Sequence, residues 1–167
     1  DRTPLDTQNG CRLWVVVPVQ APPTTGPIPN SVVDSVSGTK RHPDTPIAFG
    51  SVEPLQGEKA VDELRRQADE LGVRGFKFHP TVQGFDPSDP AYAPLFAEIE
   101  QRGLPIVVHT GQTGAGAGMP GGLGYRLGRA TPMLLDEVAA RHRDLQIILG
   151  HPAAPGQDYA LSLATHQ

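Results

Sequence analysis

Short apolar runs alternate with amphipathic segments along this 167-residue chain, and this alternation restricts the possible folds more than any other feature. Five runs rich in β-branched residues are typical of strands covered on both faces, and they lie at 12–19, 46–52, 73–79, 104–109 and 145–151. Each of the last four runs is followed by a segment that favours a helix, and these segments lie at 58–71, 90–102, 132–142 and 158–167. Gly72 and Gly103 directly follow two of them, as is common at helix ends.

This order of elements predicts an α/β fold in which parallel strands are joined by right-handed helical crossovers. Two architectures satisfy the prediction: part of a closed (β/α)8 barrel of the TIM type, or an open doubly wound sheet. A complete eight-stranded barrel needs at least roughly 200 residues. We therefore expect a partial barrel of about five parallel strands, forming a single domain over residues 1–167, with its glycines and prolines in the connections.

Charge and composition favour a small-molecule ligand. The formal net charge is −4 and lysines and arginines form no cluster, which argues against a nucleic acid or an anionic membrane as partner. No apolar run approaches the roughly 20 residues that cross a bilayer, and the single cysteine allows no disulfide framework. The first residues lack the basic start and apolar stretch of a secretory signal, so a cytoplasmic location is the expectation.

Polar residues close three of the predicted strands. Lys77 and His79 lie at the end of the third run, His109 ends the fourth and His151 ends the fifth. In barrels and in open parallel sheets alike, the carboxyl ends of the strands form the ligand site. We therefore expect these four side chains to lie together at that edge.

Alternation along the third run places Lys77 and His79 on one face and turns Phe76 and Phe78 towards helices. Neutral imidazole is the commonest side-chain ligand of zinc and similar divalent ions, so converging histidines predict part of a metal site. The alternative is that each histidine is a hydrogen-bonded structural residue. Lys77 has three interpretations: a carbamate bridging two metals, an ammonium that binds a substrate carboxylate or phenolate, or a partner for an acid at the rim.

The glycine-rich segment 111–124 lacks the Lys-Ser/Thr ending of a phosphate-binding loop. We interpret it as a lid or rim over the site, or alternatively as a plain connection, with Arg126 and Arg129 as possible contacts for an anion. The remaining histidines have polar neighbours and are expected at the surface; they are His42, His142 and His166.

Four short motifs together resemble the amidohydrolase-related family of metal-dependent hydrolases and decarboxylases, a branch of the amidohydrolase superfamily. They are Gly-Phe-Lys-Phe-His-Pro at 75–80, Gln-Gly-Phe at 83–85, Val-His-Thr-Gly at 108–111 and Leu-Gly-His-Pro at 149–152. The resemblance implies a (β/α)8 barrel that holds a divalent metal, most simply zinc, at the carboxyl ends of its strands.

On this resemblance His109 corresponds to a metal-binding histidine of the fifth barrel strand. His151 corresponds to the sixth-strand histidine, which binds a second metal in binuclear members and polarises the substrate or transfers a proton in mononuclear ones. Lys77 falls on the fourth strand, where binuclear members place their carbamylated lysine, and it is a candidate catalytic residue together with His151. His79 and Arg126 are the further candidates for contacts with the substrate.

The sequence also departs from the family pattern. No His-X-His pair occurs in it, and no aspartate of an eighth strand follows the last predicted helix. Three functions therefore stay open: a metal-dependent hydrolase acting through activated water, a non-oxidative decarboxylase of an aromatic or unsaturated acid, and an inactive remnant. Because a partial barrel leaves strand edges unpaired, we also expect self-association through those edges.

Overall fold

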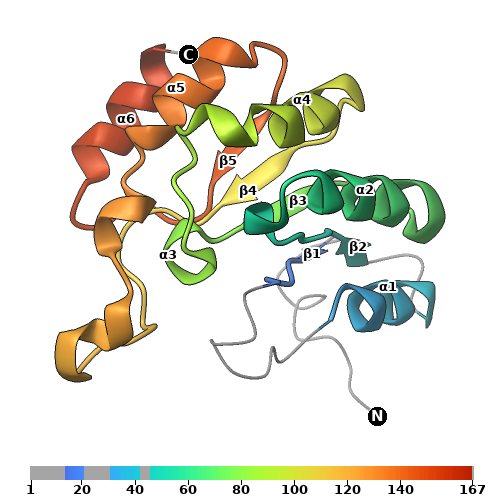
Figure 1. Cartoon of the computed structure of the whole chain (residues 1–167), viewed down its shortest axis with the longest axis horizontal. Coiled ribbons are helices and arrows are strands. Elements are labelled where there is room, and N and C mark those ends of the chain that lie inside the picture. The colour runs from blue at the N-terminus through green and yellow to red at the C-terminus, as the bar shows by residue number, and fades with distance from the viewer. Residues whose placement is uncertain (1–13, 21–30, 42–45, 167) are drawn as a thin grey trace, which may run out of the picture.

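The computed structural model describes residues 14–20, 31–41 and 46–166, which form parallel strands bordered by helices (Figure 1). The described strands are β1 (Trp14–Val16), β2 (Pro46–Ala48), β3 (Phe76–Phe78), β4 (Ile106–Val108) and β5 (Ile147–Leu149). β1 pairs with β2, and β3, β4 and β5 pair in that order, all in parallel. A parallel bridge between Gly50 and Phe76 joins the two groups, so the strands follow chain order as predicted.

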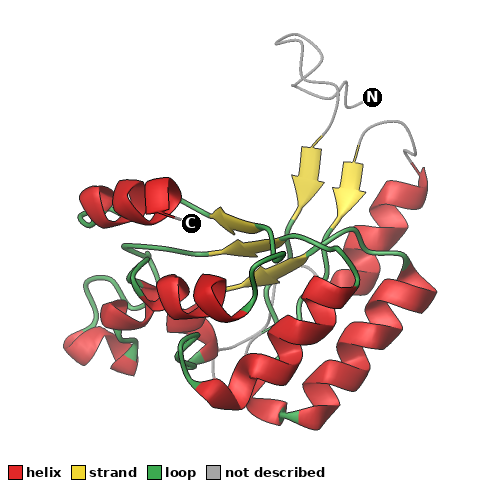
Figure 2. Cartoon of the chain, turned by 90° about the horizontal axis from the view of Figure 1, so that it is seen from above, coloured by secondary structure: helices red, strands yellow, loops and turns green. Residues whose placement is uncertain are grey.

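Helices connect the strands and lie along the outer side of the array (Figure 2). They are α1 (Val32–Arg41), α2 (Glu58–Arg66), continued by the π-helical turn η4 (Gln67–Leu71), α3 (Pro80–Gln83), α4 (Ala93–Gln101), α5 (Leu134–Arg141) and α6 (Gln157–His166). Short 3₁₀ turns add η3 (Pro54–Gln56), η5 (Pro90–Tyr92), η6 (Pro120–Gly124) and η7 (Leu127–Ala130). All four predicted helices are present.

The sequence analysis missed helix α1. Its start carries a capping interaction, because the Ser31 hydroxyl accepts the Asp34 N–H at 3.0 Å and donates to the Asp34 carboxylate at 2.7 Å. Val32 and Val36, four residues apart, are buried in the core. These two signals were present in a segment that is otherwise short and polar.

The core lies between the strands and the helices. Phe76 and Phe78 are fully buried on the helix side of β3, as predicted from the alternation of the strand. The Phe78 ring makes edge-on contacts with Phe85 and with Phe96 of α4, at centroid distances of 6.0 and 5.8 Å. This packing leaves Lys77 on the opposite, inner face of β3.

Within the described residues the array does not close into a barrel. β1 and β5 each pair on one side only, and Val15 and Ile148 on these strands are 45% and 48% exposed. The register aligns Ile148 with Val107 and Lys77 on the inner face. The observed architecture is therefore the predicted partial array of five parallel strands.

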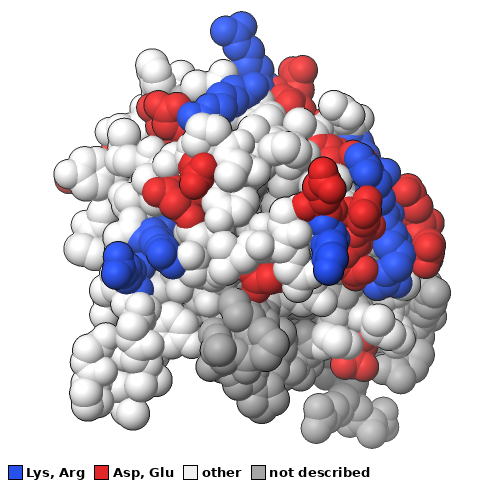
Figure 3. Space-filling model, viewed as in Figure 1, with Lys and Arg blue, Asp and Glu red and all other residues white. Residues whose placement is uncertain are grey.

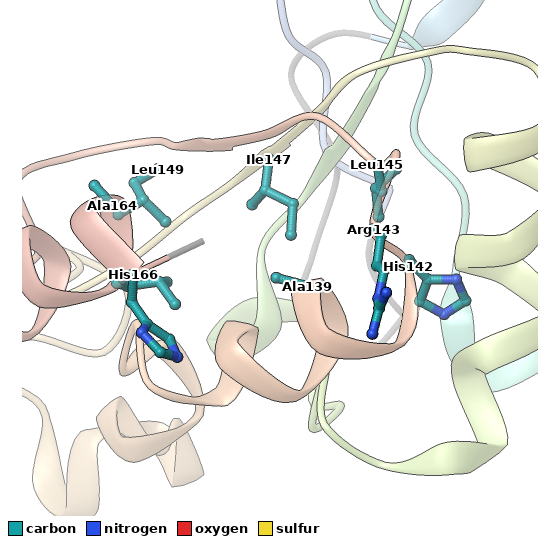
Figure 4. A pocket seen from close by; sticks show the side chains of 9 residues that line it. Ala139, His142, Arg143, Leu145, Ile147, Leu149, Ala164 and His166 are labelled. Carbon is teal, nitrogen blue, oxygen red and sulfur yellow. The ribbon is translucent and has the colours of Figure 1, made fainter.

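A cavity of about 560 Å³ lies along β5 between α5 and α6 (Figure 4). Ile147 and Leu149 line it from the strand, and Leu163 and His166 line it from α6. It follows the outer face of β5 rather than the carboxyl ends of the strands, and we assign it no chemistry.

The prediction that His142 is a solvated surface residue was wrong. The side chain is 7% exposed, its Nδ1 lies 3.1 Å from the Glu100 carboxylate of α4, and its ring packs near Phe96. Glu100 also accepts the Asp144 N–H at 2.9 Å, so it ties the end of α5 to α4. His166 is exposed as predicted, and His42 lies outside the described residues.

Charges of both signs are mixed on the face shown in Figure 3. Ion pairs link α2 and η4 to α4, with Arg65 at 2.8 Å from Glu98 and Arg102 at 2.7 Å from Asp69. Both pairs are partly exposed and contribute little to stability individually. None of the described helices has the length and apolar character needed to cross a membrane.

Self-association through the open strand edges stays a prediction, and the exposed Ile148 on β5 allows a direct test. We expect sedimentation velocity to show association that increases with concentration, because an unpaired strand edge offers backbone groups to another chain. A lysine at this position, Ile148→Lys, should weaken it by placing a charge on the edge strand. Val33→Lys, at an exposed position on α1, is the matched control, and a concentration-independent monomer would contradict the prediction.

Candidate active site at the carboxyl ends of the strands

The structure brings four of the predicted site residues together at the carboxyl ends of β3, β4 and β5. The His79 and His109 rings are stacked, with centroids 3.8 Å apart and planes at 10°. The His109 and His151 rings meet edge-on at 4.8 Å and 74°. Lys77 joins the group from β3, since a Cβ built on Gly150 would lie 2.9 Å from its Nζ.

The parallel ladder produces this arrangement. Phe78 aligns with Val108 and Leu149, and the next backbone hydrogen bond runs from the His109 N–H to the Phe78 carbonyl at 2.9 Å. His79 and His109 therefore stand at the same level, one residue beyond paired positions. The register therefore brings these two side chains next to each other.

Arg126 is the predicted site residue that the structure does not bring into this cluster. It precedes η7, it is exposed, and its carbonyl accepts a hydrogen bond from the Thr81 hydroxyl at 3.4 Å. Arg129 donates a guanidinium hydrogen bond to the Gly84 carbonyl at the end of α3, which gives it a structural partner. A role for Arg126 in substrate binding stays a prediction.

Burial shapes the charge of the cluster. It lowers the pKa of Lys77 to about 8, so the ammonium form still predominates at neutral pH. Burial, followed by the positive charges of neighbouring groups in the cluster, lowers the pKa of His79 to about 3 and that of His109 to about 4. At neutral pH the cluster thus contains one buried cation and neutral His79 and His109 rings.

Carboxylates take no part in these shifts. The groups that perturb Lys77, His79 and His109 are each other, His151 and the backbone. Within the described residues, the Lys77 ammonium therefore has no acidic partner, and the interpretation of Lys77 as one half of a rim ion pair finds no support there. A buried cation without a partner is costly, which makes an anion the natural ligand of the cluster.

His109 has the features of a metal ligand. It is 6% exposed, a hydrogen bond with the Gln112 backbone engages its ring, and its buried Nε2 has no hydrogen-bond partner among the described residues. Metal-binding imidazoles usually combine one free nitrogen with a hydrogen bond on the other. By contrast, the His79 Nδ1 accepts the Val82 N–H at 3.4 Å at the start of α3.

A complete metal site is not formed by the part of the chain that the structure describes. No group of three or more histidine, cysteine, aspartate or glutamate side chains there could hold an ion. Catalytic zinc usually requires three protein ligands. His109 fits one position of such a shell, and the described residues do not supply the others.

A second cavity, of about 410 Å³, opens beside His151 between the loops that follow β4 and β5. It is lined by Thr110, Gln112, Thr113, Gly114, Ala117, His151, Pro152 and Ala154. The Thr110 hydroxyl donates to the His151 carbonyl at 3.0 Å, and the Gln112 N–H donates to the Ala154 carbonyl at 2.8 Å. The glycine-rich segment thus forms the rim of this cavity, one of its two predicted roles.

Gly111 allows the two loops to approach each other. Its φ of +85° is unfavourable for other residues, and a Cβ there would lie 2.6 Å from the Ala153 carbonyl carbon. Sequence reasoning named the glycines of this loop but missed Thr110, Gln112 and Thr113 as lining residues. Their position directly after the strand that ends in His109 could have indicated that they line the site.

Comparison with known proteins decides the family. The sequence profile described as amidohydrolase matches residues 20–166, most of the chain. The chain belongs to the amidohydrolase family. The five-stranded parallel array is part of a TIM-barrel fold, as in a solved structure that it matches, and the alternative of an unrelated open sheet is excluded.

Solved structures confirm the barrel. A TIM-barrel protein from Bordetella bronchiseptica superimposes with a TM-score of 0.78 at 22% identity over 96% of this chain and 53% of that protein. The 5-carboxyvanillate decarboxylase of Novosphingobium aromaticivorans, complexed with manganese and 4-hydroxy-3-methoxy-5-nitrobenzoic acid, gives a TM-score of 0.60 at 23% identity. That match covers 79% of this chain and 41% of the decarboxylase.

A curated relative is the 2-amino-3-carboxymuconate-6-semialdehyde decarboxylase of Dictyostelium discoideum. It is 35% identical over 63 residues, which is 38% of this chain and 18% of the relative. The matched part of this chain thus covers less than a fifth of that relative, and the chain covers about half of the solved structures.

Gly150 leaves room for Lys77, and this generates a prediction. In Gly150→Ala the new Cβ would lie 2.9 Å from both the Lys77 Nζ and the Val108 carbonyl oxygen. We expect a loss of about 1–3 kcal/mol in the free energy of unfolding and a displaced ammonium. Urea denaturation measures the first, and the affinity for a small aromatic carboxylate measures the second. Gly128→Ala, with open space around it and away from the lining of the second cavity, should leave both unchanged.

A second prediction concerns acid stability. As the pH falls below about 6.5, the histidines of the unfolded chain gain protons, whereas His109 in the folded chain stays neutral until about pH 4. The unfolded state then binds more protons, so the free energy of unfolding should decrease from about pH 6.5 towards pH 4. Urea denaturation of His109→Gln should show a shallower decrease. The exposed-site control is His166→Gln. The prediction is contradicted if the free energy of unfolding of His109→Gln decreases as steeply as that of the native chain and of this control.

Proposed function

We propose that this site binds a small organic acid through its carboxylate, and that the protein carrying this chain is a metal-dependent, non-oxidative decarboxylase of aromatic or unsaturated acids. The observation that carries the proposal is the buried Lys77 ammonium among His79, His109 and His151, on which no carboxylate of the described residues acts. A substrate carboxylate or phenolate would neutralise this charge.

The relatives support the choice between the two enzyme classes left open by the sequence. The relative from Dictyostelium is named as a decarboxylase, and the structure from Novosphingobium is a decarboxylase that holds manganese with a hydroxylated benzoic acid. Both names specify acids that lose a carboxyl group. They support the proposal of decarboxylation, whereas hydrolysis is supported only as a property of the wider superfamily.

In the proposed reaction the bond breaks between the carboxyl carbon and the ring or alkene carbon that carries it. The carboxyl group leaves as CO₂, and the electron pair stays on the carbon, which then takes up a proton. A divalent metal, when bound, would draw electron density from the substrate oxygens and stabilise this charge. Manganese and zinc are the candidates, and His109 with its unpartnered Nε2 is the described residue that would help to hold the ion.

The other residues of the site have separate roles. The Lys77 ammonium, held on the inner face of β3, pairs with the anionic group of the substrate. His151 is exposed beside the 410 Å³ cavity, where it orients the substrate at the entrance. Gln112 and Thr113 offer hydrogen-bonding groups to ring substituents from the rim, and the buried Thr110 hydroxyl holds the His151 backbone.

Release of labelled CO₂ tests the proposal. The protein carrying this chain is incubated with Mn²⁺ or Zn²⁺ and with hydroxybenzoates labelled with ¹³C in the carboxyl group. We expect metal-dependent ¹³CO₂, reduced about 10- to 100-fold in Lys77→Ala because an ionic hydrogen bond to the substrate is lost. Lys77→Arg should retain part of the activity, and the exposed Lys59→Ala should retain all of it.

A parallel panel of esters, amides and lactones tests the hydrolase alternative. Turnover of that panel without ¹³CO₂ from any acid would overturn the decarboxylase proposal in favour of hydrolysis. Equal activity in Lys77→Ala and in the native protein would remove Lys77 from the site.

A further inference from the structure

Gln83, the last residue of α3, has a fully buried side chain that is 0% exposed. Its Oε1 accepts the His79 N–H at 2.8 Å, and its Nε2 donates to the Val52 carbonyl at 2.8 Å and to the Gln20 carbonyl at 2.6 Å. Both amide hydrogens and the amide oxygen are thus used. One side chain joins the segments that follow β1, β2 and β3.

These bonds lie where the strands end and their ladders stop. Backbone groups at such positions need other partners when they are buried. Gln83 supplies partners for three of these backbone groups. Ser51 continues the network, because its hydroxyl accepts the Gln20 N–H at 2.8 Å and donates to the Lys77 carbonyl at 3.1 Å. The backbones of Lys77 and His79 are therefore both fixed by buried side-chain hydrogen bonds.

His79 is held at two points. Gln83 binds its N–H, and its ring Nδ1 accepts the Val82 N–H, so the orientation of the ring is set. The ring then lies flat against His109 at 3.8 Å, on the residue whose Nε2 is unpartnered. The His79 ring thus lies where it can support His109, and the contact with substrate that the sequence suggested for His79 stays a prediction.

We propose that Gln83 is a positioning residue of the active site: through His79 it holds the His109 imidazole in the orientation that the site requires. The inference rests on the proposed function only where it concerns the rate of decarboxylation. The contacts of Gln83, His79 and His109 do not depend on that function. Nothing about the Gln-Gly-Phe motif at 83–85 indicated this role in the sequence.

The test compares variants that break the chain of contacts at different points. Gln83→Met keeps the size of the side chain and removes all three hydrogen bonds. His79→Phe keeps a ring against His109, whereas His79→Ala removes it. The control is His142→Leu, which removes another buried polar side chain whose described partners, Glu100 and Phe96, lie away from the site.

The first measurement is NMR of the imidazole groups at fixed pH. In the native chain we expect nuclear Overhauser contacts between the His79 and His109 rings, and ¹⁵N shifts of a neutral His109 in a single tautomer. Gln83→Met should weaken the contacts and shift the His109 nitrogens, and His142→Leu should not. Equal changes in both variants, or none in Gln83→Met, would overturn the proposal and leave Gln83 a stabilising residue alone.

The second measurement is kinetic and uses the ¹³CO₂ assay on the protein carrying this chain. We expect Gln83→Met and His79→Ala to lower kcat on the order of 10- to 100-fold with a smaller change in KM, and His79→Phe to recover much of the loss. Loss in His79→Phe as large as in His79→Ala would contradict a supporting role for the ring. If the native protein releases no CO₂, the proposed function fails, and the NMR comparison still decides the role of Gln83.

Should Gln83→Met not fold, NMR of His79→Ala against His79→Phe tests the contact through which Gln83 is proposed to act. The first should release the His109 ring, and the second should keep it. Identical His109 shifts in the two variants would then overturn the proposal.

Discussion

The parallel hydrogen-bond ladder of β3, β4 and β5 is the constraint on which the site depends. Its register places Phe78, Val108 and Leu149 at one level, so the residues that follow them emerge together at the carboxyl edge. The buried apolar side chains of the same strands, such as Phe76 and Phe78, face the helices, so the opposite face of the strands is the inner one. A slip of one residue would bury Lys77 against the helices and turn Phe78 inward, so core packing and site geometry are set by the same choice.

Much of this could be predicted from the sequence because the information is local. Apolar runs and three-to-four-residue periodicity located the five strands and four of the helices, and the alternation Phe76, Lys77, Phe78, His79 assigned each face correctly. The parallel connection then brought Lys77, His79, His109 and His151 to one edge. Helix α1 was missed because only Val32 and Val36 mark its buried face among polar residues.

The remaining features depend on contacts distant in the chain. Gln83 binds carbonyls 31 and 63 residues away, and no short pattern encodes such partners. The burial of His142 depends on Glu100, 42 residues earlier, so its polar neighbours in sequence misled the prediction. That no carboxylate of the described residues acts on Lys77 likewise became visible only in three dimensions, because it depends on which side chains the fold brings together.

The order of the strands has a consequence for how the chain acquires its structure. Each described strand pairs only with strands adjacent in the sequence, and aligned residues are about 30 to 40 positions apart. Each pairing therefore closes a moderate loop, and its entropic cost depends only weakly on loop length. The array can therefore form by adding one strand and its helix at a time to a strand that is adjacent in the sequence. The strand ends that carry the site can begin to form without a segment distant in the sequence.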